Sequence, residues 1–150
     1  MTSEDNPRVF LPPPLIFGGL LALGLLLDSH PPSSAPASVI GMALGAGGIV
    51  VVAIALGLFR SSRTRPEPWQ PASSLVDRGL YRFTRNPMYL GMALLSLGIA
   101  MAFTSLPGVL LALAALVIID RFVVTREEAY LTRRFGQDYT AYKARVRRWL

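Results

Sequence analysis

Three residues with basic or amide side chains, Arg82, Arg85 and Asn86, stand directly before a long apolar run. Asn86 is followed by Pro87, a pair typical of a helix start. The first backbone N–H groups of a helix have no partner within the helix. An Asn side chain can accept from them, and a Pro at the first helical position has no N–H to leave unpaired. A helix N-terminus beside a guanidinium favours binding of an anion. On spacing alone, a second interpretation stays open: a plain helix cap whose arginine follows the topology rules of membrane proteins.

A second polar pair, Glu127 and Glu128, lies in the C-terminal part of the chain. If this region is helical, Val124, Leu131 and Phe135 fall close to one line and form an apolar stripe. The two glutamates flank that stripe on either side. We therefore expect both carboxylates at the edge of a buried surface.

Carboxylates at such an edge need partners, and the nearest basic residues expected at the same level are Arg82 and Arg85. One interpretation is a structural ion pair or a solvated bend. The other is a polar pocket between the start of one helix and the end of the next. Five tyrosines would form its walls: Tyr81, Tyr89, Tyr130, Tyr139 and Tyr142.

The composition excludes several kinds of site. The chain has 150 residues, no cysteine and one histidine, His30. Disulfides, thiolate nucleophiles and metal sites built from Cys or His clusters are therefore not expected, and we predict no metal. Glycines 45, 47 and 48 lack the GxGxxG spacing, so a Rossmann-type nucleotide loop is not expected either.

Charge and hydropathy indicate a membrane. Hydrophobic residues make up 52% of the chain, the mean hydropathy is +0.44, and the net charge is +6. The basic residues gather in two blocks beside apolar segments. That distribution is typical of loops near anionic lipid headgroups, so we expect membrane lipid, and no nucleic acid, as a partner.

Four apolar segments are long enough, or nearly so, to cross a bilayer. They are residues 11–27, 39–59, 88–103 and 109–124, the last two joined by a tight turn at 104–108. Lys and Arg number one, none, six, none and eight in the successive flanking stretches. This alternation predicts four transmembrane helices, with both termini and the loop 60–87 in the cytoplasm. We place them in the inner or plasma membrane.

The first apolar segment has a competing interpretation as a secretory signal. It is short, and the small residues at 35–37 are similar to a cleavage site. Glu4 and Asp5 stand where a signal would carry positive charge. We therefore expect residues 1–37 to be retained.

The predicted fold is an all-α integral membrane domain whose fourth helix extends beyond the bilayer and ends at Gly136, a typical C-cap. The basic stretch 135–150 fits an amphipathic helix that closes the pocket, or a plain interfacial anchor. Gly41 and Gly45 form a small-residue face that packs another helix, within one chain or between two. The oligomeric state stays open.

Two sequence blocks carry a resemblance to a known family. Residues 85–91 read RNPMYLG, and residues 127–146 read EEAYLTRRFGQDYTAYKARV. They resemble the isoprenylcysteine carboxyl methyltransferase and phospholipid methyltransferase superfamily of small membrane enzymes, in the same order and joined by a helical hairpin. The likeness covers residues 75–150. Asn86 stands where many members have His, and Asn cannot change charge near neutral pH.

The resemblance implies S-adenosylmethionine as cofactor, held at the cytoplasmic face by residues 75–150, with residues 1–74 as an N-terminal hairpin and loop. It implies methyl transfer to a lipophilic or small amphipathic acceptor, with Arg145 and Glu128 as candidate catalytic residues. The implied cofactor-binding residues are Tyr81, Arg85, Asn86, Pro87, Tyr89, Gly91, Glu127, Glu128, Tyr139 and Tyr142. The alternative is a non-catalytic membrane scaffold that binds lipid or a partner protein.

Overall fold

The computed structural model describes residues 11–29, 36–65 and 71–150, and all regular structure within these ranges is helical. The elements in order are α1 (Pro13–Leu26), α2 (Pro36–Ser61), η1 (Gly79–Arg82), α3 (Pro87–Ala102), α4 (Leu106–Ile118), η2 (Ile119–Val124), α5 (Thr125–Phe135) and α6 (Gln137–Arg145). The all-α prediction is therefore confirmed for these ranges.

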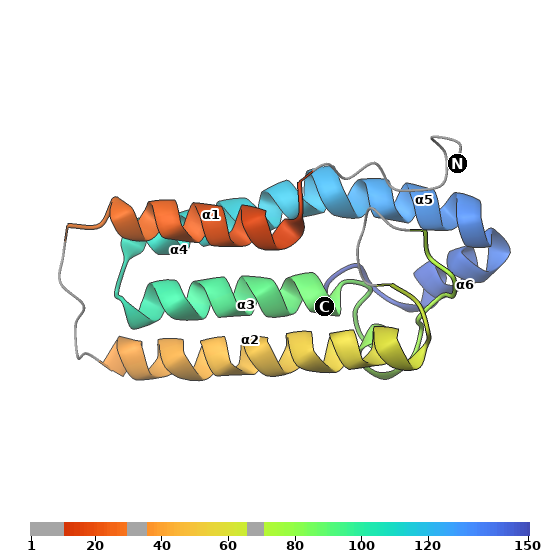
Figure 1. The fold of residues 1–150 in the computed structure, drawn as a ribbon, viewed down its shortest axis with the longest axis horizontal. Helices are drawn as coiled ribbons and strands as arrows, with labels where there is room; N and C mark the ends of the chain where they lie inside the picture. The colour runs from red at the N-terminus through yellow and green to blue at the C-terminus, as the bar shows by residue number, and fades with distance from the viewer. Residues whose placement is uncertain (1–10, 30–35, 66–70) are drawn as a thin grey trace.

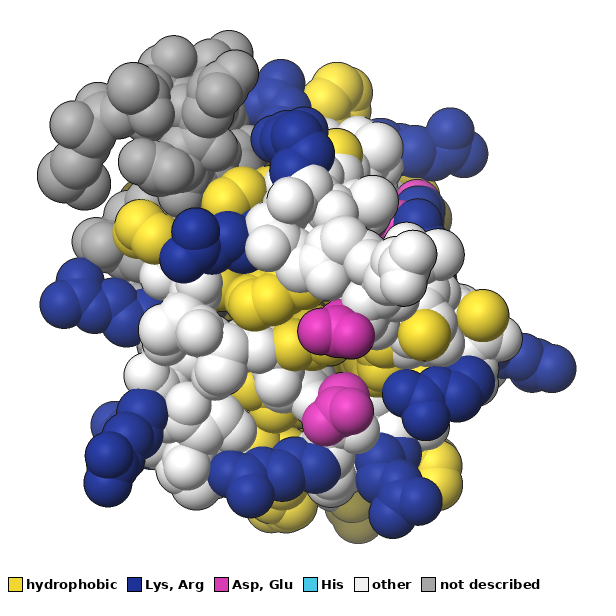
Figure 2. Space-filling view, turned by 90° about the vertical axis from the view of Figure 1, so that its right-hand side faces the viewer, with side chains coloured by type: hydrophobic (Ala, Val, Ile, Leu, Met, Phe, Trp, Pro, Cys, Tyr) yellow, Lys and Arg dark blue, Asp and Glu magenta, His cyan; other side chains and the backbone are white. Residues whose placement is uncertain are grey.

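Helices α1 to α4 lie side by side along the long axis of the molecule, with α1 against α4 and α2 against α3 (Figure 1). Helix α5 continues the line of α4, and α6 folds back at the same end of the molecule. Figure 2 shows that end face, where Lys and Arg side chains form a rim around apolar and polar side chains. The two polar blocks of the sequence therefore meet at one end of a helical bundle.

Within the described ranges, two helices are long and apolar enough to cross a membrane: α2, and the continuous helix Leu106–Phe135. Helices α1 and α3 have 14 and 16 residues and are shorter than a usual span. Large apolar side chains project outward from the bundle, among them Leu15, Ile40 and Leu110. Such a surface suits lipid better than water. Four spanning helices and cytoplasmic termini stay predictions.

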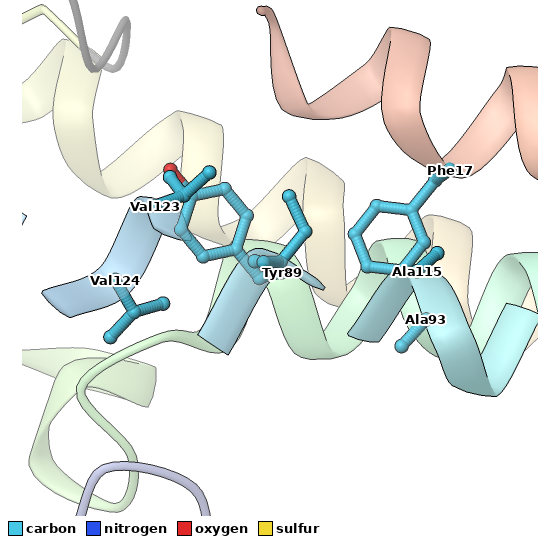
Figure 3. Close-up of a cluster of buried hydrophobic side chains, with 7 residues drawn as sticks. Phe17, Tyr89, Ala93, Ala115, Val123 and Val124 are labelled. Carbon is cyan, nitrogen blue, oxygen red and sulfur yellow. The ribbon is translucent and has the colours of Figure 1, made fainter. Parts of the chain in front are cut away.

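The apolar core lies where α1, α3, α4 and η2 meet. Its buried members are Phe17, Tyr89, Ala93, Ala115, Ile119, Val123 and Val124. In Figure 3 the ring of Tyr89 lies beside Val123, and Phe17 reaches down from α1 towards Ala115. This cluster fixes the start of α3 against the end of α4.

Helices α2 and α3 approach closely along glycines. A Cβ placed on Gly98 of α3 would lie 2.3 Å from the backbone N of Gly45, and one on Gly41 would lie 2.6 Å from the carbonyl O of Gly98. A Cβ on Gly48 would meet the carbonyl O of Gly91 at the same 2.6 Å. The predicted face at Gly41 and Gly45 is therefore used within the chain.

Several helix boundaries differ from the prediction; α2, for example, runs from Pro36 to Ser61 rather than over 39–59. Helix α4 begins at Leu106 rather than at 109, because the Ser105 hydroxyl accepts from the Gly108 N–H at 3.1 Å and caps the helix. The first helix has 14 residues rather than the predicted 17, beginning at Pro13 and ending at Leu26. The wide π-helical turn η2 was not predicted. Such turns often occur near functional sites.

We predict that Gly98→Ala destabilises the protein by about 1–3 kcal/mol, because the added methyl group meets backbone that cannot move aside cheaply. The measurement is equilibrium unfolding in detergent. The control is Gly47→Ala, since a Cβ there meets nothing within 4 Å. The control is expected to leave stability unchanged or slightly raised. Equal losses in both variants would contradict the glycine packing.

Candidate functional site

A cavity of about 120 Å³ lies at the basic end of the bundle, between the loop after α2, the start of α3, α5 and α6. Its polar lining includes Arg65, Arg85, Asn86 and Glu127, and all five tyrosines predicted to wall a pocket line it. The rest of the lining is largely apolar, from residues such as Phe59, Met88 and Leu131. The predicted pocket between two helix ends is therefore present.

The five tyrosines come from four elements, namely η1, α3, α5 and α6, and the hydroxyls of Tyr89, Tyr130 and Tyr142 form hydrogen bonds within the protein. The hydroxyl of Tyr142 donates to the carbonyl O of Tyr81 at 2.7 Å. The hydroxyl of Tyr130 accepts from the backbone N of Ala72 at 3.0 Å. Phe59 meets the Tyr81 ring edge-on, with ring centroids 5.6 Å apart. The aromatic walls are therefore held in place by the protein itself.

Burial favours the neutral form of three tyrosines that line the cavity, Tyr81, Tyr139 and Tyr142. It raises the pKa of Tyr81 and of Tyr142 well above the ordinary value. Burial and the charge of Glu128 raise the pKa of Tyr139 to about 12, although Arg85 lowers it. These groups therefore offer ring faces and neutral hydroxyls near physiological pH.

Arg85 lines the cavity, and its side chain is 11% exposed. Its Nη2 lies 3.2 Å from Oε1 of Glu128. Its Nε and Nη1 are buried, and neither meets a hydrogen-bond acceptor in the part of the chain that the structure describes. Arg85 is also close enough to the Tyr139 hydroxyl to lower its pKa. Unpaired buried donors are rare and suit an anionic ligand.

Glu127 is the acid that faces the cavity. Its Oε1 accepts from the hydroxyl of Tyr89, which reaches it from α3. Helix α5 carries Glu and Arg pairs and lies beyond the apolar span that ends at Val124. The pKa of Glu127 is raised to about 7: burial raises it most, the bond from Tyr89 lowers it, and the charge of Glu128 also raises it. Glu127 therefore exchanges a proton near neutral pH.

Glu128 is surrounded by basic side chains and is not among the residues that line the cavity. Arg148 grips it with two bonds, Nε to Oε1 at 3.0 Å and Nη2 to Oε2 at 2.8 Å. Lys143 lies 3.8 Å away. The predicted partner Arg85 is confirmed, whereas Arg82, also predicted, is exposed and lies in a separate hollow.

The C-terminal tail returns to the start of α3. The carbonyl O of Arg147 accepts from the backbone N of Arg85 at 3.0 Å. The carbonyl O of Arg148 accepts from Nδ2 of Asn86 and from the Thr84 hydroxyl, both at 3.0 Å. The prediction that the Asn86 side chain caps α3 is therefore wrong. The helix has no side-chain cap bond, and the Asn86 amide donates to the tail instead.

The remaining predicted residues lie outside the cavity lining. Pro87 is fully buried as the first residue of α3. Gly91 lies in the contact with α2, where a Cβ would come within 2.7 Å of Val52. Arg145 lies in the separate hollow, which Arg78, Arg82, Asp77, Tyr142 and Val146 also line. The structure thus brings together Tyr81, Arg85, Asn86, Tyr89, Glu127, Tyr139 and Tyr142.

Sequence reasoning missed Arg148, the arginine that contacts Glu128 most closely. Asp120 was a signal that could have found it, because a carboxylate inside an apolar helix calls for a donor. Nη1 of Arg148 lies 3.2 Å from Oδ1 of Asp120, and Nε1 of Trp149 donates to the same oxygen at 2.9 Å. Both donors come from the last three residues.

Comparison with known proteins gives a family and two relatives. The model of the phospholipid methyltransferase family matches residues 36–138. An uncharacterized protein of Haemophilus influenzae is 49% identical over 35 residues, which is 23% of this chain and 56% of that protein. The protein-S-isoprenylcysteine O-methyltransferase of Schizosaccharomyces pombe is 35% identical over 72 residues, 48% of this chain and 30% of that enzyme.

The matched stretches therefore cover less than two thirds of either relative. No solved structure gives a significant match.

The raised pKa of Glu127 predicts a pH-dependent stability. Between the ordinary value of 4.5 and about 7, the folded protein keeps a proton that the unfolded chain releases. The stability that this group contributes therefore falls as pH rises through that window. We expect the Tm of Glu127→Gln minus the Tm of wild type to increase steadily from pH 4.5 to pH 7. A Tm difference that stays constant with pH would contradict the burial of this carboxyl.

Proposed function

The chain belongs to the phospholipid methyltransferase family, and we propose that it transfers a methyl group from S-adenosylmethionine to a lipophilic or small amphipathic acceptor at a membrane surface. The observation that carries the proposal is the cavity in which Arg85 presents two unpaired buried nitrogens among aromatic walls. The methyl transfer named for the S. pombe relative supports the same reaction class.

The residues of the cavity suit this cofactor in charge and in surface. Arg85 has N–H groups on Nε and Nη1 that meet no acceptor among the described residues, and a carboxylate accepts charge-assisted hydrogen bonds from such groups. Glu127 offers a carboxylate to an ammonium or to ribose hydroxyls. The tyrosine ring faces attract a cation such as a sulfonium. A cavity lined by both an arginine and a glutamate suits a molecule that carries both charges.

S-adenosylmethionine supplies a methyl group on a positively charged sulfur, ready for displacement by a nucleophile. The protein's part is alignment and exclusion of water. Arg85 and Glu127 fix the orientation, and the tyrosines, held by bonds such as Tyr142 to Tyr81, form walls that keep their shape. Glu127, with a pKa of about 7, is also placed to hold or release a proton at the cavity.

The acceptor, in this proposal, reaches the cavity from the membrane. The outward apolar side chains of the bundle suit a bilayer, and the basic rim suits the headgroup level on the cytoplasmic side. Tyr142 lines both the cavity and the hollow that contains Arg145. We therefore assign to Arg145 contact with an anionic part of the acceptor, outside the cofactor cavity.

The test of the function is direct binding of radiolabelled S-adenosylmethionine to detergent-purified protein. We expect wild type to bind, and Arg85→Gln to weaken binding by about 10- to 100-fold, the cost of charge-assisted bonds. Glu127→Gln should weaken it in the same direction. Arg133→Gln removes an exposed arginine of α5 and is expected to bind as wild type does.

Folded protein that binds no S-adenosylmethionine at millimolar concentration would contradict the enzyme and favour the membrane scaffold. A scaffold has no use for an arginine with unpaired buried nitrogens.

The role of Arg145 is tested with two acceptors, an S-prenylated cysteine with a free carboxylate and a phospholipid with a primary amine. We expect Arg145→Gln to raise the KM for whichever acceptor is methylated, because both carry an anionic group. The dissociation constant of S-adenosylmethionine should stay unchanged, since Arg145 does not line the cavity. Weaker cofactor binding with an unchanged KM would contradict this assignment.

A further inference from the structure

The carboxylate of Glu128 is shared unequally by two arginines. Arg148 takes both oxygens, with Nε on Oε1 at 3.0 Å and Nη2 on Oε2 at 2.8 Å. Arg85 makes one contact, from Nη2 to Oε1 at 3.2 Å. The two-bond grip therefore belongs to the arginine that does not line the cavity.

This division decides what Arg85 can still bind. A guanidinium that grips a carboxylate with two bonds uses Nη2 together with either Nη1 or Nε. In Arg85 both of these nitrogens are free of acceptors among the described residues. Arg148 already takes both oxygens of Glu128, so Arg85 contacts that carboxylate through one nitrogen, and its other two meet no acceptor among the described residues.

Arg148 is itself fixed by contacts that do not involve Arg85. Its Nη1 lies 3.2 Å from Oδ1 of Asp120, which also accepts from Nε1 of Trp149. Its carbonyl O accepts from Nδ2 of Asn86 and from the Thr84 hydroxyl. The tail, η2 and the start of α3 therefore set the position of Arg148 before any ligand binds.

We infer that Arg148 is a positioning residue: by holding both oxygens of Glu128, it keeps two donors of Arg85 free for a carboxylate ligand in the cavity. Without Arg148, Glu128 takes a second nitrogen of Arg85, and the donors facing the cavity fall from two to one. The inference rests on the proposed function, because the carboxylate in question is that of the methyl donor.

The test compares S-adenosylmethionine with decarboxylated S-adenosylmethionine, which differs only in lacking the carboxylate. Dissociation constants are measured on the full chain in detergent. We expect Arg148→Gln to raise the dissociation constant of S-adenosylmethionine by about tenfold, which corresponds to the loss of roughly one charge-assisted bond. Binding of the decarboxylated ligand should change less than about twofold. A general loss of structure would weaken both ligands equally.

Three further variants sharpen the test. Arg147→Gln changes the neighbouring exposed arginine, whose carbonyl rather than side chain contacts Arg85, and is expected to behave as wild type. Arg85→Gln should lose the same discrimination between the ligands. The double variant with Arg148→Gln should be no worse than Arg85→Gln alone, because Arg148 acts through Arg85.

A milder variant tests the same role in case Arg148→Gln does not fold. Trp149→Phe removes one bond to Asp120 and loosens Arg148 without changing Glu128 or Arg85. We expect it to reduce the same discrimination to a smaller extent. Equal weakening of both ligands by Arg148→Gln and Trp149→Phe, or additive losses in the double variant, would overturn the positioning role alone. Wild type that binds neither ligand would overturn the proposed function as well.

Discussion

The carboxylate of Glu128, buried at one end of the bundle, is the constraint on which the site depends. A buried charge costs several kcal/mol unless it is paired and hydrogen-bonded. Its partners come from three separate places: Arg85 before α3, Lys143 on α6 and Arg148 in the tail. Satisfying this one group therefore requires that the loop before α3, α5, α6 and the C-terminus all meet.

The helical bundle supplies the rigid base for that meeting. Close glycine contacts hold α2 against α3, and a buried cluster that includes Tyr89 holds α3 against η2. Tyr89 belongs to both parts, because its ring lies in the core and its hydroxyl donates to Glu127. The apolar core and the polar cavity are thus joined through a single side chain, and movement of α3 relative to α5 would disturb both.

The sequence was informative where a local pattern determines structure. Apolar runs gave the helices to within a few residues, helical phase placed Glu128 at a buried edge, and the five tyrosines expected around the pocket line one cavity. It failed where the outcome depends on competition between distant groups. Asn86 donates to a carbonyl of the tail instead of capping its own helix, and Arg148 grips Glu128 more closely than Arg85 does. Nothing in local spacing ranks one arginine above another.

Glu127 and Glu128 are adjacent in sequence, yet the fold gives them opposite environments. One residue step turns a helix by about 100°, which is enough to separate the cavity from the ion cluster. Glu128 meets three cations, from Arg85, Lys143 and Arg148. Glu127 meets the Tyr89 hydroxyl and aromatic walls, and burial raises its pKa to about 7. The two carboxylates therefore differ in their surroundings: Glu128 lies in a cluster of cations, and Glu127 lines the cavity, where the proposed function assigns it a ligand.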